Sequence, residues 1–250
     1  MQAFEGGFDT SHLTFLHRGD APGGVRPLAR YYEAVPADFG LIMGSGRDNE
    51  SGATSWTVNI MGMPFHKVIS RGAGGETPIG FHAWVPMDDE NCMIYSIEYR
   101  SDRPLGEEEM QRSKNWLYIH AETEPGGERC VQNLGNDFRI DRALQASGKS
   151  YTGIRGFGIQ DCGIQESMGP IVERTLEHLG VSDTHIIKLR RFLLKTLKDV
   201  GNGAEPPGLR GASYRVRSAM FTLPEGVKFE QEAHDWVRIG LRIEQPLMAK

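Results

Sequence analysis

The sequence has no long hydrophobic run, few cysteines and no excess of positive charge. No apolar stretch approaches the length of a membrane span, and we expect no signal peptide before Glu5. The net charge of -5 provides no basic field for nucleic acid or an anionic membrane. The cysteines Cys92, Cys130 and Cys162 form neither a disulfide framework nor a Cys-x-x-Cys pair. These absences predict a cytoplasmic protein that binds neither nucleic acid nor membrane.

The length bounds the domain organisation. A chain of 250 residues, 39% of them hydrophobic, is long enough for one large domain with a substantial core. We therefore expect a single domain over residues 1–250. The first informative motif begins only a few residues after Met1, although a helix start needs capping or packing. We expect that an upstream segment is missing or that the reading frame is truncated.

The order of the predicted elements indicates an α+β fold. Segments rich in β-branched and aromatic residues follow one another at hairpin spacing, which favours an antiparallel meander over a parallel sheet. The expected strands are residues 30–35, 39–43, 55–63, 65–70, 79–85, 92–100 and 214–223.

Helices are expected at residues 104–121, 137–147 and 160–167, with Asp161 at the start of the last of these. The clearest helical pattern in the chain begins with a cap at residues 182–184 and runs to about Val200. Its apolar positions predict a wide buried stripe. They are Ile186, Ile187, Leu189, Phe192, Leu193, Leu194 and Leu197. A sheet curved around this helix would enclose a cavity.

Asp9, His12 and His17 form a D-x-x-H-x-x-x-x-H pattern. Residues three apart share a helix face, so Asp9 can hold the ring of His12 from the preceding turn. A spacing of five places His17 off that face. The helix must therefore widen by one residue, or end so that His17 lies just beyond it, and the glycines and proline of residues 18–24 favour the second option.

Two histidines on one element make an incomplete metal site, because open iron sites of the 2-His-1-carboxylate type need an acid as third ligand. A zinc hydrolase is less favoured, since the chain has no H-E-x-x-H motif. The spacing alone also fits two surface histidines with Asp9 as a helix cap. Asp161 could likewise be the N-cap of its own helix instead of a metal ligand.

Two groups of residues resemble a known family in order and separation. The first is residues 2–12 with 15–17, and the second comprises residues 151–154, 160–171, 177–180, 182–183 and 190–191. On these residues the sequence resembles the C-terminal catalytic domain of the α subunit of Rieske non-haem iron aromatic ring-hydroxylating oxygenases. It is most similar to their phthalate 4,5-dioxygenase-like group.

The resemblance implies a helix-grip fold, with His12, His17 and Asp161 as ligands of Fe(II). It implies that Asp9 bonds to the first histidine and links the iron to a Rieske [2Fe–2S] cluster in the neighbouring subunit of a homotrimer. Electrons would come from NAD(P)H through a separate reductase or ferredoxin. Iron would then activate O2 to hydroxylate or O-demethylate an aromatic substrate, carboxylated or not.

The chain departs from the family in one respect. The Rieske half of the family needs Cys-x-His and Cys-x-x-His, and no cysteine here is followed by histidine at either spacing. We expect the N-terminal Rieske domain to be absent from this chain, so that the cluster comes from a missing or partner domain. A helix-grip module that binds a small molecule, or a remnant oxygenase without turnover, are the alternatives.

Other candidate residues have more ordinary interpretations. Glu5 could line the iron site or be a solvated acid at a helix start. Cys162 is read as a small packing residue rather than a redox centre. The remaining histidines lack a nearby acid at a useful spacing and are read as structural or surface groups. These are His66, His82, His120, His178, His185 and His234.

Overall fold

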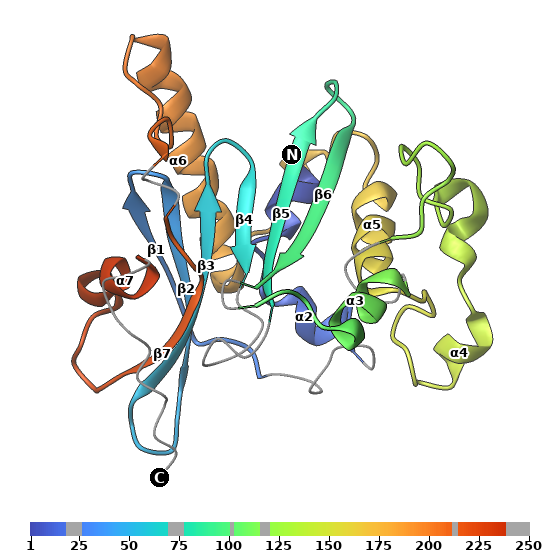
Figure 1. Cartoon of the computed structure of the whole chain (residues 1–250), viewed down its shortest axis with the longest axis horizontal. Helices are drawn as coiled ribbons and strands as arrows, with labels where there is room; N and C mark the ends of the chain where they lie inside the picture. Colours follow the sequence, from blue (N-terminus) through green and yellow to red (C-terminus); the bar gives the residue numbers. More distant parts are fainter. Residues whose placement is uncertain (19–26, 70–77, 101–102, 116–120, 212–214, 239–250) are drawn as a thin grey trace. The chain divides into compact units, whose positions relative to one another are not determined.

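The computed structural model describes residues 1–18, 27–69, 78–100, 103–115, 121–211 and 215–238 (Figure 1). The chain forms two compact units. The first consists of Met1–Leu28, Val85–Ser96 and Arg103–His178, and the second of Ala29–Trp84, Ile97–Asp102 and Leu179–Lys250. Helices and a curved antiparallel sheet together confirm the predicted α+β class.

The strands arise from the β-branched and aromatic segments of the sequence. Their bounds are β1 Tyr31–Ala37, β2 Gly40–Asp48, β3 Thr54–Gly62, β4 His66–Ile69, β5 Ile79–Pro86, β6 Cys92–Tyr99 and β7 Ala219–Leu223. β1 to β5 pair in chain order, each antiparallel to the next. β6 follows β5 in this order, and β7 pairs with β3. The predicted meander is confirmed, with β7 as its one strand out of chain order.

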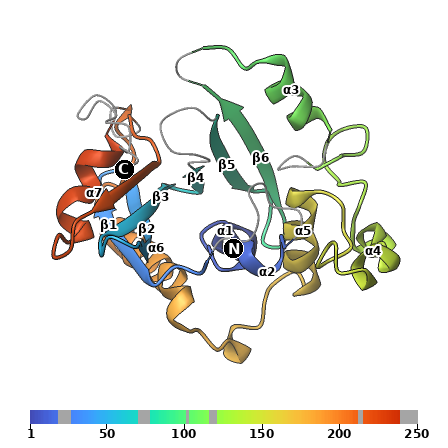
Figure 2. The same ribbon diagram turned by 90° about the horizontal axis from the view of Figure 1, so that it is seen from below.

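Helices cover both faces of the sheet in the second unit (Figure 2). These helices are α6 Thr184–Gly201 and α7 Phe229–Val237. Phe229 of α7 lies against Gly44 of β2, whereas His185 of α6 meets the ring of Tyr32 in β1. Tyr32 pairs with the residue that follows Gly44, and successive residues of a strand point to opposite faces. The two helices therefore lie on opposite faces.

The main core of this unit lies between α7 and strands β2, β3 and β7. Phe229, Ala233 and Val237 of α7 pack with Trp56 and Phe221, among other buried apolar residues. The rings of Trp56 and Phe229 lie 4.5 Å apart. Sequence reasoning did not predict α7, although its buried residues follow the i, i+4, i+8 spacing of an amphipathic helix.

The expected burial of α6 is wrong in its second half. Ile186 and Leu189 are buried, but Leu194 and Leu197 are 67% and 70% exposed. The C-terminal half of the helix extends past the strands of this unit, so its apolar residues find no sheet to pack on (Figure 1). Asp183 is the N-cap residue of α6, as expected, but its side chain does not bond to the first turn of the helix, because its carboxylate accepts a hydrogen bond from Gly180 N instead.

The first unit is mainly helical. Its α-helices are α1 Gln2–Gly6, α2 His12–Phe15, α3 Glu107–Lys114, α4 Arg142–Ala146 and α5 Phe157–Ser167. The helix predicted over residues 104–121 is present as α3, and residues 116–120 lie outside the described part of the chain. The helix predicted over 137–147 is present only as α4, because residues 137–139, the last three of the 3₁₀ segment Leu134–Arg139, have positive φ.

The side chain of Gln2 ties α1 to the C-terminal end of α5 and the residues just after it. The amide nitrogen of Gln2 donates to the carbonyl oxygens of Gly169 at 2.6 Å and Gln165 at 3.3 Å. Its amide oxygen accepts from Val172 N at 3.2 Å. The last carbonyls of a helix have no partner within the helix, so Gln2 satisfies groups that would otherwise need water. This contact holds the N-terminal segment beside α5.

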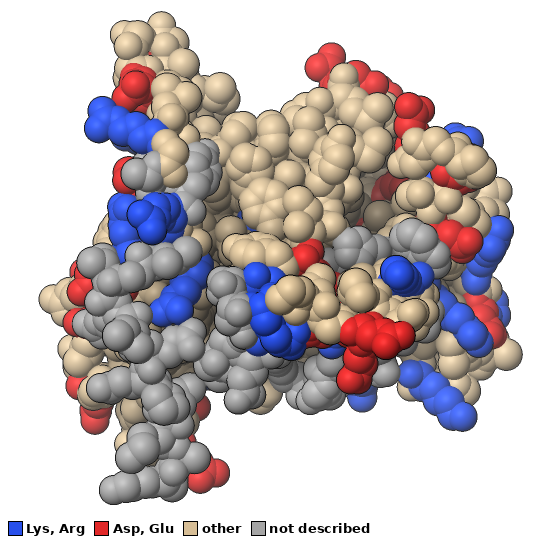
Figure 3. All heavy atoms as spheres, viewed as in Figure 1, with Lys and Arg blue, Asp and Glu red and all other residues tan. Residues whose placement is uncertain are grey.

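None of the helices in the described part of the chain is both long enough and apolar enough to cross a membrane. On the face drawn in Figure 3, basic and acidic side chains both occur. The three cysteines are not in disulfides, as expected.

Gly44 leads to a prediction about stability. A Cβ at this position would lie 2.4 Å from two ring atoms of Phe229 and 3.0 Å from Trp56, so Gly44→Ala must push α7 off the sheet. We expect a loss of about 1–3 kcal/mol in the free energy of unfolding, measured by urea titration. Gly201→Ala, at the end of α6, is the control, because no described residue other than its chain neighbours and the backbone of its own helix has an atom within 4 Å of the place that the added methyl group would take. Equal stabilities of the two variants would contradict this packing.

Candidate metal centre

Asp9 lies in the short link between α1 and α2 and caps the second helix. Its Oδ1 accepts hydrogen bonds from Ser11 N at 2.7 Å and Ser11 Oγ at 2.6 Å, and its Oδ2 accepts from His12 N at 3.2 Å. The expectation that Asp9 and His12 share one helix face is therefore wrong. The same carboxylate still reaches the ring of His12, with Oδ2 at 3.5 Å from Nδ1.

The two histidines lie at opposite ends of α2. His12 is its first residue, and His17 follows its last residue, Phe15, by two positions. This confirms the prediction that the helix ends and leaves His17 just beyond it. The ring centroids of His12 and His17 are 5.1 Å apart and the rings are inclined at 71°. His12 is 21% exposed, whereas His17 is fully buried.

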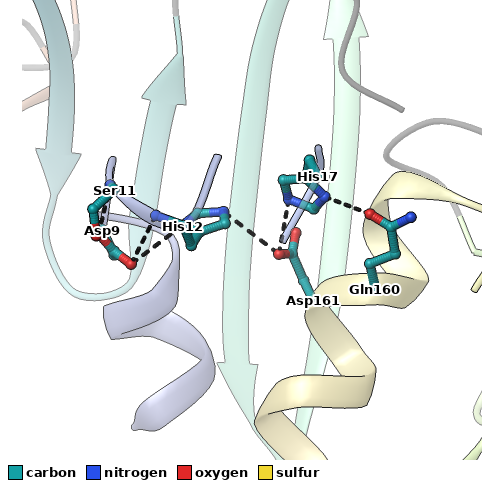
Figure 4. A network of polar contacts seen from close by, with 6 residues as sticks. All are labelled: Asp9, Ser11, His12, His17, Gln160 and Asp161. Atoms are coloured by element: carbon teal, nitrogen blue, oxygen red, sulfur yellow. Dashed lines mark hydrogen bonds and ion pairs between the residues drawn. The ribbon is translucent and has the colours of Figure 1, made fainter. Parts of the chain in front are cut away.

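Asp161 is the fifth residue of α5, which starts at Phe157. Gly156, with φ of 105°, ends the preceding loop, and its carbonyl accepts the first helical hydrogen bond, from Gln160 N at 3.1 Å. Asp161 is therefore too far into the helix to cap it, and the capping interpretation is wrong. Its side chain points away from the helix toward the two histidines (Figure 4).

The three side chains converge. Asp161 Oδ1 lies 3.2 Å from His17 Nε2 and 3.5 Å from His12 Nε2. One potential ligand atom from each residue lies within 4.8 Å of the others. The histidines come from the N-terminal segment and the carboxylate from α5, more than a hundred residues later, and all belong to the first unit.

His17 Nε2 is the least satisfied polar atom of the cluster. It is buried and has no hydrogen-bond partner among the residues that the structure describes, although a carboxylate oxygen is near. A buried polar atom without a partner costs stability, so such an atom calls for an explanation. A metal ion on this nitrogen supplies one, and two imidazole nitrogens with one carboxylate oxygen are a donor set that suits Fe(II) with open positions.

Two further residues fix the ring of His17. Phe157, at the start of α5, stacks on it with centroids 3.5 Å apart and planes inclined by 15°. Gln160 Oε1 lies 2.7 Å from the other ring nitrogen, Nδ1. Sequence reasoning missed both roles. Successive residues on a helix point in different directions, so the position of Gln160 next to Asp161 does not predict that its side chain reaches His17.

The electrostatics of Asp9 follow from its contacts. Burial raises the pKa of the carboxyl, but the hydrogen bond and charge of His12 and the hydrogen bonds of Ser11 outweigh this. Together they lower the pKa from 3.8 to about 2. Asp9 therefore carries a full negative charge beside His12 throughout the neutral range.

Glu5 does not reach the cluster and is not a solvated acid, so both expectations for it are wrong. It is 6% exposed, and its Oε2 accepts a hydrogen bond from the guanidinium of Arg174 at 2.8 Å. The same nitrogen donates to Glu177 at 2.8 Å. This ion pair joins α1 to the segment after α5, so Glu5 helps to hold the two ligand-bearing elements together.

Cys162 packs where sequence reasoning expected it to. It lies with Cys130 against the small core of Phe138, Ile154 and Ile159. A hydrogen bond with Cys130 and burial raise the pKa of its thiol well above the usual value, which disfavours the reactive thiolate.

Outside this unit, His185 is a buried structural residue whose Nε2 donates to the carbonyl oxygens of Glu33 and Gly44.

Residues 81–242 match the family model described as LigXa C-terminal domain like. The chain is 30% identical to the 3-chlorobenzoate-3,4-dioxygenase oxygenase subunit of Comamonas testosteroni over 258 residues. This match covers 92% of this chain and 58% of that protein. It is also 33% identical to the phthalate 4,5-dioxygenase oxygenase subunit of Pseudomonas putida over 136 residues. This match covers 54% of this chain and 30% of that protein. The chain thus spans less than two thirds of either relative.

The lowered pKa of Asp9 predicts how stability depends on pH. Because the pKa in the folded protein lies below the unfolded value, the stabilisation is complete above about pH 4 and is lost as the pH falls toward 2. We expect the difference in free energy of unfolding between the metal-free wild type and Asp9→Asn to fall by about 2 kcal/mol across this window. Urea titrations at several pH values measure it. A difference that stays constant down to pH 2 would contradict the lowered pKa.

Proposed function

Since the chain belongs to the LigXa C-terminal domain-like family and is a Rieske oxygenase catalytic domain, we propose that it is the iron-bearing oxygenase component of a Rieske-type system. In this proposal it hydroxylates or O-demethylates an aromatic substrate with O2. The convergence of His12, His17 and Asp161 is the observation that carries the proposal.

The proposed ligands are His12 Nε2, His17 Nε2 and an oxygen of Asp161. Fe(II) held by three protein ligands keeps open coordination positions, and when bound it supplies the activation of dioxygen beside the substrate. The chain's own residues hold these ligands in place. Burial of His17 and its stacking on Phe157 exclude water from one side of the site.

Asp9 is proposed as the residue that orients His12 and connects it to the electron donor. Its carboxylate lies beside Nδ1 of His12, so it can hold a proton on that nitrogen and leave Nε2 to face Asp161. In this role Asp9 acts through His12 rather than on the substrate. Its low pKa keeps it charged, which strengthens the hydrogen bond that it accepts from that nitrogen.

The substrate class is proposed from the relatives. One is named for 3-chlorobenzoate and the other for phthalate, and both of these compounds are aromatic carboxylates. We propose that this chain acts on the same class. An arginine or lysine in the pocket would pair with the substrate carboxylate.

The other parts of the system are also proposals. Electrons would reach the iron from a Rieske [2Fe–2S] cluster outside this chain, supplied through a reductase or ferredoxin and ultimately by NAD(P)H. We further propose a homotrimer, a cytoplasmic location and a helix-grip arrangement in which the sheet closes around α6. The single-domain organisation over residues 1–250 stays a prediction.

Metal loading tests the site directly. We expect about one Fe(II) per chain after anaerobic loading and desalting, measured by colorimetric iron analysis. His12→Ala or Asp161→Ala should lose the iron, since either change removes one of three ligands. His178→Ala is the matched control, because this exposed histidine lies outside the cluster. A wild type that takes up no iron would favour a module that only binds a small molecule.

Asp9→Asn separates the proposed relay from iron binding. We expect iron content to stay at the wild-type level, because Asp9 is not a ligand, while coupled hydroxylation falls by about 10–100-fold. The measurement is product formation per NADH oxidised, with a Rieske domain and reductase supplied. Ser51→Ala, in an exposed loop of the second unit, controls for nonspecific effects. Wild-type coupling in Asp9→Asn would remove the relay from the account.

A further inference from the structure

The fully buried side chain of Gln160 has both ends of its amide engaged. Its Nε2 lies 2.8 Å from the carbonyl oxygen of Ile154, and its Oε1 lies 2.7 Å from His17 Nδ1. A backbone carbonyl can only accept a hydrogen bond, so the amide nitrogen must face Ile154. The amide oxygen must then face the histidine, because the opposite orientation would bring two oxygens together.

This orientation determines which nitrogen of His17 carries the proton. An amide oxygen has no hydrogen to give, so a bond of 2.7 Å requires a hydrogen on Nδ1. The other ring nitrogen, Nε2, is buried and has no hydrogen-bond partner among the described residues. In the tautomer with its hydrogen on Nδ1, Nε2 keeps a lone pair directed at the cluster.

We infer that Gln160 is a positioning residue that sets the tautomer and rotation of His17, so that the lone pair of Nε2 faces the cluster and is available to a metal. The inference rests on the proposed function only in that a metal ion is expected to bind His17 Nε2. The tautomer itself is a property of the metal-free protein. The role is distinct from that of Asp161, the neighbouring residue on the same turn of α5, which contributes an atom to the cluster itself.

The two histidines are thus oriented by different chemistry. His12 is partly exposed and is paired with the carboxylate of Asp9, whereas His17 is fully buried and is paired with a neutral amide. Asp9 and Asp161 already supply two negative charges, which balance one divalent cation. A third carboxylate at position 160 would add a buried charge without a partner, which is costly. A glutamine gives the hydrogen bond without that charge.

Gln160 also links the two proposed ligands mechanically. Its backbone belongs to α5, which carries Asp161, and its amide holds both His17 and the carbonyl of Ile154 in the loop before the helix. A displacement of α5 would therefore move the carboxylate ligand and the group that orients the histidine ligand together. The geometry between His17 and Asp161 is preserved by this shared attachment.

Histidine-ring NMR on the metal-free, full-length chain tests the inference. Long-range ¹H–¹⁵N correlation distinguishes a protonated ring nitrogen from one with a lone pair, and His17→Gln assigns the signal. We expect wild-type His17 to carry its hydrogen on Nδ1. Gln160→Met, which keeps the length of the side chain and removes the acceptor, should shift the hydrogen to Nε2. Gln160→Glu, which retains an acceptor, should keep it on Nδ1.

Co(II), which is stable to oxygen, is the metal probe in a second measurement. We expect Gln160→Met to lower Co(II) affinity by about 10–100-fold, measured by competition with a chromophoric chelator. Gln132→Met is the matched control, because Gln132 also donates to a backbone carbonyl, that of Phe138, but contacts no proposed ligand. Its Co(II) affinity and the His17 signal should stay at the wild-type values.

Hydrogen on Nε2 in the wild type would overturn the inference without the need for any variant. Unchanged tautomer and Co(II) affinity in Gln160→Met would overturn it as well. A different result would contradict the proposed function and not the role of Gln160. A wild type that has the expected tautomer but binds no iron would contradict the oxygenase proposal and leave the role of Gln160 in place.

Discussion

A buried imidazole nitrogen beside a carboxylate is the constraint on which the site depends. His17 Nε2 is buried, lacks a hydrogen-bond partner among the described residues, and lies 3.2 Å from Asp161 Oδ1. Folding gives up the hydration of that nitrogen without replacing it, which costs stability unless a ligand completes the contact. The surrounding contacts keep the arrangement from relaxing, since Phe157 stacks on the ring and Gln160 holds its other nitrogen.

The rest of the first unit keeps two distant segments in register. Gln2 satisfies carbonyls at the end of α5, and Glu5 reaches Arg174 in the segment that follows. Both contacts join the N-terminal segment, which carries the histidines, to α5, which carries Asp161. Each is made by a polar side chain with a defined geometry, so the segments have little freedom to slide. Ligand geometry is thus a consequence of contacts made well away from the ligands.

Much of the fold, and the position of His17 in the site, were predictable because their signals are local. Strand segments were identified from β-branched and aromatic residues, and the stop signals after His17 placed it beyond its helix. Position along an element was harder to predict. Asp161 was expected at a helix start, but the start is set by Gly156, whose positive φ is a property of the folded chain. The burial of α6 depends on where the sheet ends, and the role of Gln160 depends on a contact 143 residues away in sequence. Neither leaves a pattern in the sequence.

Anomalous diffraction at the iron edge, from crystals grown and loaded with Fe(II) without oxygen, locates the metal itself. We expect one strong peak bounded by His12 Nε2, His17 Nε2 and an oxygen of Asp161, with metal–ligand distances of about 2.0–2.2 Å. A peak at any other position, or ligation of the metal through Nδ1 of His17, would contradict this expectation.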